Sequence, residues 1–318
     1  MPRLSRSENQ KFEEAARAGW LYYVAGKTQD EIARQLSISR QSAQRLVALS
    51  VSEGLIRVRL EHPIAKCMEL GARLQERFNL MACEIVPSDV ESPAATVGLA
   101  NKGAVEMERI FKATEPKLVA LGTGRILRSV AEELSNMNCP QHRIVSLVGN
   151  IANDGFATPY DVAVHVAERL RCRYYPMPLP VISKVESERA QLHAQPHIEN
   201  VLGLAKQADV SFVGIGNLGL KSPVFMDGLV SEKEVAELDK MGAVGEIIGW
   251  IFNKDGHVLQ CDLNKRVLSA PLELASTKPV FGIAAGEEKV DAILGALRSK
   301  LINSLITNEY TAERILNS

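Results

Sequence analysis

The sequence has 318 residues, of which 46% are hydrophobic and 24% are charged, and its formal net charge is −1. This length predicts about two domains, and this composition is typical of an ordinary globular protein. No apolar run approaches the roughly 18 residues of a membrane span, and the first residues lack the apolar stretch of a signal peptide, so we expect a cytoplasmic protein.

The charge is unevenly distributed along the chain. Residues 1–60 carry ten Lys and Arg against six Asp and Glu, so this segment is basic by four charges while the remainder is acidic by five. A small basic segment on a mildly acidic body indicates a module that binds a polyanion, joined to a second domain of another kind.

Three helices are predicted in the basic segment. Residues 9–25 have apolar side chains at helical spacing, and Gly26 ends the pattern. The sequence TQDE that follows is a capping box, in which Thr28 and Glu31 satisfy each other's backbone amides at the start of a second helix. Ser39 can cap a third helix that runs to about residue 52, and Ser37 stands in the tight turn between the two.

The third helix has two chemically different faces, followed by a basic strand. Ala43, Leu46, Val47 and Ser50 recur at the spacing of a buried stripe, while the opposite face is polar. The segment LIRVRLE then alternates apolar and basic residues, which predicts a half-buried strand. Two short helices, a tight turn and a basic strand predict a winged helix-turn-helix DNA-binding domain over residues 1–60.

The polar face carries the side-chain types that read DNA. Arg and Gln make bidentate contacts with guanine and adenine, and flanking arginines bind phosphates without regard to sequence. The alternative is a three-helix structural subdomain with a solvated face. The predicted DNA-binding residues are Thr28, Gln29, Ser39, Arg40, Gln41, Ser42, Gln44 and Arg45, with Arg57 and Arg59 on the strand.

Residues 61–80 predict an amphipathic linker helix, and residues 81–318 predict a larger α/β domain. Strand-like segments occur near CEIVP, LVALG, IVSLVG, VSFVGIG, EIIGWIF, VFGIA and NSLIT, and helix-like segments lie between them. This alternation predicts a doubly wound, mostly parallel sheet that binds ligands at the carboxyl ends of its strands.

Several glycine-bearing turns follow these strands. Gly122, Thr123, Gly124 and Arg125 connect a strand directly to a helix, and Gly286 leads into another helix with Lys289 in its first turn. Backbone amides and cations in such turns favour an anionic group, most simply a phosphate, although a steric role for the glycines and a surface role for the lysine stay open.

Two further features are weaker. The loop GIGNLG at 214–219 has the spacing of a dinucleotide motif, but Pro223 and a loop follow where a helix is needed, so we expect a loop beside the ligand. Glu246 enters an apolar strand, where its carboxylate is either a solvated edge residue or an acceptor for ligand hydroxyls.

No catalytic or metal-binding pattern stands out. The six histidines lack metal-ligand spacing, and the five scattered cysteines include no C-x-x-C pair, as is typical of reduced thiols. There is no nucleophile elbow and no P-loop lysine. We therefore expect neither an enzyme nor a cofactor or metal.

The whole chain resembles the SorC-type sugar-binding bacterial transcriptional regulators. The stretches that carry the resemblance are LYYVAGKTQDEIARQLSISRQSAQRLV, ADVSFVGIG, GAVGEIIGWIFNKDG, FGIAAGEEKVDAILGAL and LINSLITNEYTAERIL, spread over residues 20–316. The resemblance implies a helix-turn-helix joined to an effector domain similar to sugar-phosphate isomerases and glucosamine-6-phosphate deaminase.

The resemblance also assigns effector contacts. It implies that the turn Gly122–Arg125, Glu246 and Lys289 line the effector pocket. The chain departs from the family in two places. Trp250–Asn253 replace an Arg, two Phe and an Asp, and Asn150 stands where paired glycines are usual, so that Asn150 joins the predicted effector contacts.

Together these observations predict a DNA-binding regulator of carbohydrate catabolism. Its partners would be an operator in double-stranded DNA, a sugar, polyol or sugar-phosphate effector, and further copies of itself in a homodimer or homotetramer. The alternative is a sugar-phosphate isomerase or deaminase with an accessory DNA-binding domain, against which the missing acid–base pair argues.

Overall fold

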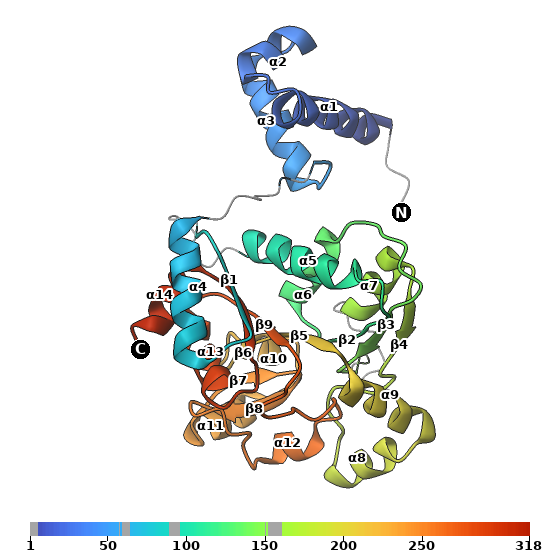
Figure 1. Cartoon of the computed structure of the whole chain (residues 1–318), viewed down its shortest axis with the longest axis vertical. Helices are drawn as coiled ribbons and strands as arrows, with labels where there is room; N and C mark the ends of the chain where they lie inside the picture. The colour runs from blue at the N-terminus through green and yellow to red at the C-terminus, as the bar shows by residue number, and fades with distance from the viewer. Residues whose placement is uncertain (1–5, 57, 59–63, 89–95, 150, 152–160) are drawn as a thin grey trace. The chain divides into compact units, whose positions relative to one another are not determined.

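The computed structural model describes residues 6–56, 58, 64–88, 96–149, 151 and 161–318 (Figure 1). The chain divides into two compact units, Met1–Pro63 and Ile64–Ser318.

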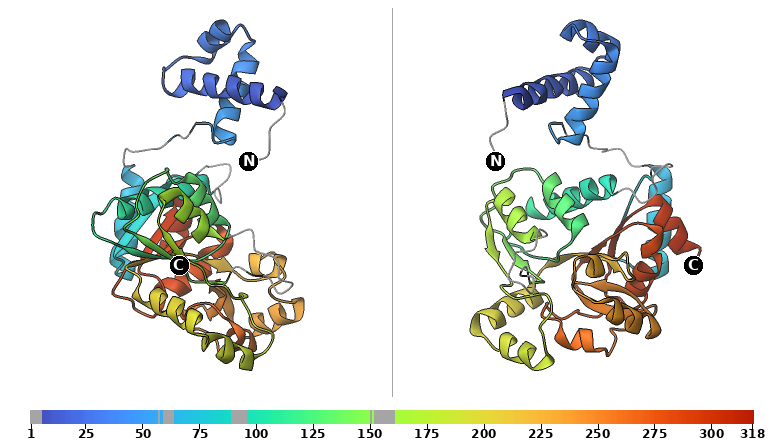
Figure 2. Two further views of the ribbon diagram at one scale, coloured as in Figure 1. Left: turned by 90° about the vertical axis from the view of Figure 1, so that its right-hand side faces the viewer. Right: turned by 180° about the vertical axis from the view of Figure 1, so that it is seen from behind.

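The smaller unit contains the three predicted helices, which pack against one another (Figure 2). Their bounds are α1 Arg6–Tyr23, α2 Gln29–Leu36 and α3 Arg40–Ser52. A small apolar core joins them: Ala18, Leu21, Ile32, Ala33, Ala43 and Val47. The helix-turn-helix arrangement of α2 and α3 is confirmed.

Local hydrogen bonds explain where α2 and α3 begin. The Thr28 backbone N–H donates to Glu31 Oε2 over 2.8 Å and the Glu31 N–H donates back to the Thr28 hydroxyl over 3.3 Å, which confirms the capping box. The Ser39 hydroxyl accepts from the Ser42 N–H over 3.0 Å at the start of α3. Between the helices Ser37 has φ 54°, a left-handed conformation that glycine adopts more easily.

The predicted basic strand falls largely on residues that the structure does not describe, including Arg57 and Arg59. Its described residues Leu55, Ile56 and Val58 are in no strand. In place of a ladder bond, the Ile56 N–H donates to the Ser50 carbonyl over 2.9 Å, which folds this segment back on α3.

The larger unit is built on a seven-stranded sheet in the order β1-β10-β9-β5-β2-β3-β4, in which every pair is parallel. The strands are β1 Ala82–Val86, β2 Leu118–Leu121, β3 Arg143–Ser146, β4 Arg173–Tyr175, β5 Val210–Gly214, β9 Val280–Ile283 and β10 Ser304–Asn308. The predicted parallel α/β fold is confirmed, and β4 is an additional short edge strand.

Helices cover both faces of this sheet. One apolar cluster joins α5 Val97–Phe111, α6 Arg125–Glu133 and α7 Val162–Leu170 to one face, and these three helices lie together in Figure 1. A second cluster joins the other face to α4 Ala65–Phe78, α9 Pro196–Gln207, α13 Val290–Arg298 and α14 Glu309–Leu316. In β2, Val119 and Leu121 face the first cluster and Leu118 and Ala120 face the second, as the alternation of a strand requires.

The predicted linker helix is α4, which packs in the larger unit. Its Leu70 and Leu74 are buried in the second cluster, and Arg77 donates to the Ile315 and Leu316 carbonyls at the end of α14. Among the described residues, α4 therefore forms part of the wall of the α/β unit.

The segment EIIGWIF is a hairpin, so the prediction of a single strand there is wrong. β7 Ala243–Ile247 and β8 Trp250–Asn253 pair antiparallel, and β6 Gly216–Asn217 completes a small three-stranded sheet. The turn consists of Ile248 with φ 48° and Gly249 with φ 88°. Two consecutive residues of positive φ are typical of a tight hairpin turn. A β-branched residue such as Ile248 rarely adopts this conformation, so the sequence did not predict a turn here.

The larger unit also contains several short helical elements. They are α8 Glu186–His193, α10 Pro223–Met226, α11 Glu232–Lys240, α12 Asp262–Arg266 and the 3₁₀ turn η1 Glu287–Lys289.

Candidate functional site

The strand order creates a switch point at the centre of the sheet. The chain leaves β2 toward β3 and β4 on one side, and it leaves β5 toward β9 and β10 on the other. In open α/β sheets, ligands bind beside the carboxyl ends of the strands at such a point. The turn after β2, the loop after β5 and the turn after β9 are neighbours there, because β9, β5 and β2 are adjacent strands.

The connections after β2 and β9 each contain a glycine with the same unusual backbone conformation. Gly124 has φ 116° and ψ 169°, and Gly286 has φ 124° and ψ 150°. This conformation is essentially restricted to glycine. Gly124 immediately precedes α6, and Gly286 immediately precedes η1, which continues into α13. Each glycine therefore turns the chain from a strand end into a helix start, a kind of position that favours an anion or a hydroxyl oxygen.

Close backbone contacts fix the turn after β2 in place. The Gly122 N–H donates to the Phe212 carbonyl of β5 over 2.8 Å. A Cβ on Gly122 would lie 3.1 Å from Cγ2 of Ile248, so glycine lets the hairpin turn approach this strand end. The Thr123 carbonyl lies against Gly214 of β5. The predicted residues Gly122, Thr123 and Gly124 thus lie at the end of β2, beside β5 and the hairpin turn.

Glu246 in β7 faces this region from the hairpin. Its Oε2 accepts from the Gly249 N–H over 2.8 Å, and its strand partner is Gly216, where a Cβ would collide with the Glu246 carboxylate. Burial raises the pKa of Glu246, while the bond from Gly249 and the charge of Lys289 act in the opposite direction. Glu246 is a partly buried acceptor held by backbone and does not lie at a solvated edge.

Lys289 approaches from the turn after β9. Its Nζ donates to the Ile215 carbonyl, in the loop after β5, over 3.0 Å. Burial lowers the pKa of Lys289, the carboxylates of Glu246 and Glu288 raise it, and the charge of Arg125 lowers it. Lys289 therefore interacts electrostatically with two other predicted effector residues, Glu246 and Arg125, and it is not a freely solvated surface lysine.

Arg125, the first residue of α6, meets a residue that the sequence did not single out. Its Nη2 lies 3.3 Å from Oδ1 of Asp227, which follows α10. The only sequence signal for Asp227 was its position shortly after the GIGNLG loop. The structure thus brings together Gly122, Thr123, Gly124, Arg125, Glu246 and Lys289, and it adds Asp227.

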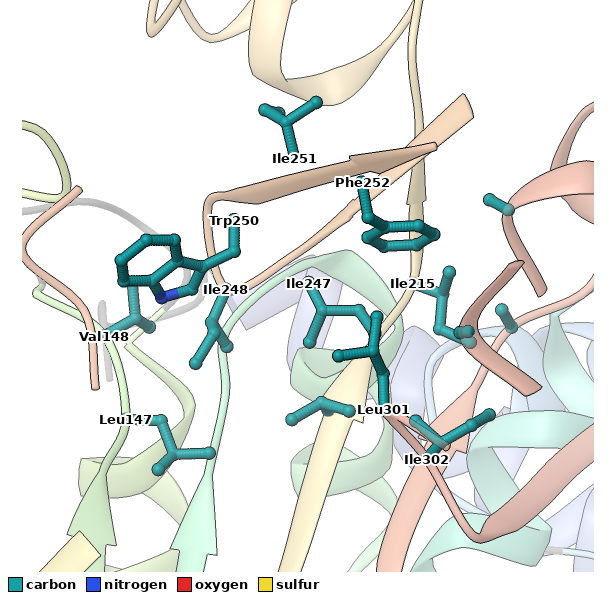
Figure 3. Close-up of a cluster of buried hydrophobic side chains, with 14 of the residues drawn as sticks. Leu147, Val148, Ile215, Ile247, Ile248, Trp250, Ile251, Phe252, Leu301 and Ile302 are labelled. Atoms are coloured by element: carbon teal, nitrogen blue, oxygen red, sulfur yellow. The ribbon is translucent and has the colours of Figure 1, made fainter. Parts of the chain in front are cut away.

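The two departures from the family pattern have different outcomes. Asn150 lies outside the described residues. Trp250 is 9% exposed, its Nε1–H donates to the Ala270 carbonyl over 2.9 Å, and the guanidinium of Arg189 lies 5.0 Å from a ring centroid. Figure 3 shows the indole beside Val148 and Ile248, so Trp250 packs the hairpin against the segment after β3.

The predicted DNA-reading residues occupy one exposed face of the smaller unit. On α3, Gln41, Gln44 and Arg45 are exposed, whereas Ala43 and Val47 are buried, as the helical spacing predicts. Arg40 is also exposed and lies 3.5 Å from the carboxylate of Asp30 on α2.

The other predicted DNA contacts that the structure describes serve as helix caps or adjoin them. The Thr28 hydroxyl is engaged with Glu31 Oε2 over 2.9 Å, and the Ser39 and Ser42 hydroxyls lie 2.9 Å apart. Gln29 is half-buried at the start of α2. Thr28, Ser39 and Ser42 therefore shape the two helices whether or not they also contact DNA.

Other kinds of site are not found among the described residues. No group of three or more His, Cys, Asp or Glu there could hold a metal ion. No helix in the described part of the chain is long and apolar enough to cross a membrane. A cavity of about 440 Å³ in the larger unit is lined by Leu147, Leu202, Ile247 and Ile248, and by none of the predicted effector residues.

Comparison with known proteins identifies the family. Residues 62–317 match the family model described as a sugar-binding domain. The erythritol catabolism regulatory protein EryD of Brucella abortus is 32% identical over 302 residues, which are 95% of this chain and 96% of that protein. The transcriptional regulator LsrR of an Enterobacter strain is 31% identical and covers 95% and 92% of the two chains.

Solved structures show the same fold. The full-length sorbitol operon regulator SorC of Klebsiella pneumoniae superposes with a TM-score of 0.69 at 24% identity, covering 96% of this chain and 99% of that one. A DeoR family transcriptional regulator of Listeria monocytogenes superposes with a TM-score of 0.71 at 24% identity, covering 78% of this chain and 99% of that one. The chain has a helix-turn-helix unit and a sugar-binding domain, and its relatives are transcriptional regulators and not enzymes. It is therefore a transcriptional regulator that belongs to the SorC-type family of sugar-binding transcriptional regulators.

Proposed function

We propose that the protein binds an operator through α3 and that a small sugar, polyol or sugar phosphate modulates this binding from the strand-end site of the larger unit. The effector half of the proposal rests on one observation: the connections that follow β2, β5 and β9 lie together at one switch point of the sheet. They bring Arg125, Glu246 and Lys289 together with two glycine-capped turns.

The chemistry of the site suits a polyhydroxy compound. Carboxylates accept hydrogen bonds, ammonium and guanidinium groups and backbone amides donate them, and a hydroxyl does both. A ring or chain that carries several hydroxyls can therefore satisfy Glu246 and Lys289 at the same time. The names of the relatives support this class, since one is an erythritol catabolism regulatory protein and another, from Bacillus subtilis, is a deoxyribonucleoside regulator.

The effector half is tested by a thermal-shift screen against sugars, polyols and their phosphates. A ligand at about 100 times its Kd stabilises a protein by about 2.7 kcal/mol, which is several degrees of melting temperature for a domain of this size. We expect at least one compound to produce this shift and also to change operator affinity in a gel-shift assay. If the compounds that raise the melting temperature leave operator affinity unchanged, the proposal that the effector modulates operator binding is refuted.

We further propose that the protein acts in the cytoplasm as a homodimer or homotetramer on a near-palindromic operator. One helix-turn-helix unit of this size buries too little surface for tight specific binding at physiological salt. Paired units related by two-fold symmetry would read half-sites separated by about one helical turn or a multiple of it.

The expected result is a dimer or tetramer in sedimentation experiments at micromolar concentration. Inserting five base pairs between the half-sites should abolish tight binding, whereas inserting ten should restore part of it, because ten base pairs return the second half-site to the same side of the duplex. A monomer that binds a single half-site as tightly as the whole operator would contradict the prediction.

A further inference from the structure

The effector site holds an ion pair that links two separate connections. Arg125 opens α6 after β2, and Asp227 lies between α10 and α11 in the connection that follows β6. Arg125 Nη2 and Asp227 Oδ1 are 3.3 Å apart, and the two side chains are 57% and 34% exposed. The carboxylate therefore lies at the guanidinium that the sequence assigned to an anionic ligand.

The second cation of the site also has acidic neighbours. Lys289 Nζ is bonded to the Ile215 carbonyl, and the carboxylates of Glu246 and Glu288 are close enough to favour its charged form. Arg125 thus lies beside the carboxylate of Asp227, and the negative charges of Glu246 and Glu288 act on Lys289.

This balance changes which ligand the site favours. A phosphate ester carries about 1.5 to 2 negative charges near neutral pH and offers almost no donor, so it would be repelled by carboxylates that only accept. A like charge within about 4–6 Å disfavours the ionised form of a group. A hydroxyl, by contrast, can donate to Asp227 and accept from Arg125 without displacing either.

We propose that Asp227 is a specificity-determining residue that directs the effector site toward an uncharged polyhydroxy compound, a polyol or unphosphorylated sugar, and against its phosphate ester. This inference rests on the proposed function, since it presumes that the strand-end site binds the effector. The glycine turns and the two cations alone would favour a phosphate, and the charge of Asp227 opposes that preference.

The test compares the full-length protein with Asp227→Asn, which keeps the shape and one acceptor but removes the charge. The probes are erythritol, ribitol and glucitol, a monophosphate of each, and inorganic phosphate, measured by calorimetric titration and thermal shift. We expect the unmodified protein to bind at least one polyol roughly tenfold or more tightly than its phosphate. Asp227→Asn should shift that ratio toward the phosphate by roughly tenfold or more, which corresponds to about 1.4 kcal/mol.

Two further variants keep the outcome unambiguous. Asp227→Glu preserves the charge and should keep the preference for the uncharged probe. Asp239→Asn removes an equally charged and exposed carboxylate, in α11, and should change nothing. Inorganic phosphate should stabilise Asp227→Asn at lower concentrations than it stabilises the unmodified protein, so Asp227 is tested even without the natural effector.

The outcomes separate the two hypotheses. An unmodified protein that binds the phosphate ester more tightly, or an Asp227→Asn variant with an unchanged ratio, overturns the role of Asp227 while the proposed function stands. If no organic probe binds either protein and inorganic phosphate affects both equally, the role of Asp227 is also overturned, and the effector site itself is called into question.

Discussion

Replacing Glu246 by alanine is expected to weaken effector binding by roughly tenfold to a hundredfold, because hydrogen bonds to a charged group are each worth about 1.5–3 kcal/mol. The loss should apply to uncharged and phosphorylated compounds alike, since Glu246 would bind hydroxyls that both share. Operator binding without effector should not change, because Glu246 lies in β7 of the larger unit and the operator contacts are proposed for α3 of the smaller one. Calorimetric titration and gel shift measure the two quantities separately.

The dependence on pH provides an independent check of this role. Burial raises the pKa of Glu246 above its ordinary value. If the effector binds the ionised carboxylate, binding releases any proton that Glu246 still holds. Effector affinity should therefore fall as the pH is lowered through this raised pKa and should level off above it.

The isosteric variant Glu246→Gln separates charge from shape. It keeps an oxygen that can accept from the Gly249 N–H, so the hairpin turn should be retained, but it has no carboxylate to titrate. We expect it to lose the pH dependence together with part of the affinity. Glu237→Ala, on the exposed side of α11, is the matched control and should bind like the unmodified protein. Unchanged affinity in both Glu246 variants would exclude Glu246 from the effector site.

The elements that the sequence predicted well are those that depend on neighbouring residues along the chain. The capping box of Thr28 and Glu31 and the buried stripe of α3 involve residues three or four positions apart, and the structure confirms both. The same is true of the turn at Gly122–Arg125, because a strand, two glycines and a helix are contiguous there. Ser37 shows that a residue with an unfavourable conformation can still be placed correctly when both flanking helices are clear.

Features that depend on residues far apart in the sequence could not be predicted in the same way. Arg125 and Asp227 are 102 positions apart, and nothing in either local sequence reveals their contact. The adjacency of β2, β5 and β9 likewise follows from the order of the sheet, which alternating strands and helices do not specify. Ile248 illustrates a local failure, since its β-branched side chain favours a strand, but the residue stands in a turn with φ 48° among apolar side chains (Figure 3).

Replacing Gln41 or Arg45 by alanine is expected to cost about 1–3 kcal/mol of operator binding, and to relax base preference at one position of each half-site. Both side chains are exposed on the same face of α3, opposite the buried Ala43 and Val47. Alanine favours helix formation at least as well as either residue, so loss of binding would not reflect loss of α3. Gln35→Ala on the exposed side of α2 is the matched control.

The basic residues beyond α3 should behave differently from Gln41 and Arg45. A side chain that binds only phosphate contributes equally on every sequence, and its removal lowers the slope of log affinity against log salt by about one unit. Arg57→Ala should therefore weaken operator and random DNA by the same factor, whereas Gln41→Ala should weaken the operator selectively. These affinities are measured by fluorescence anisotropy on both duplexes across a salt series. Equal losses on the two duplexes for Gln41→Ala would show that the exposed face of α3 holds the backbone of DNA and does not read its bases.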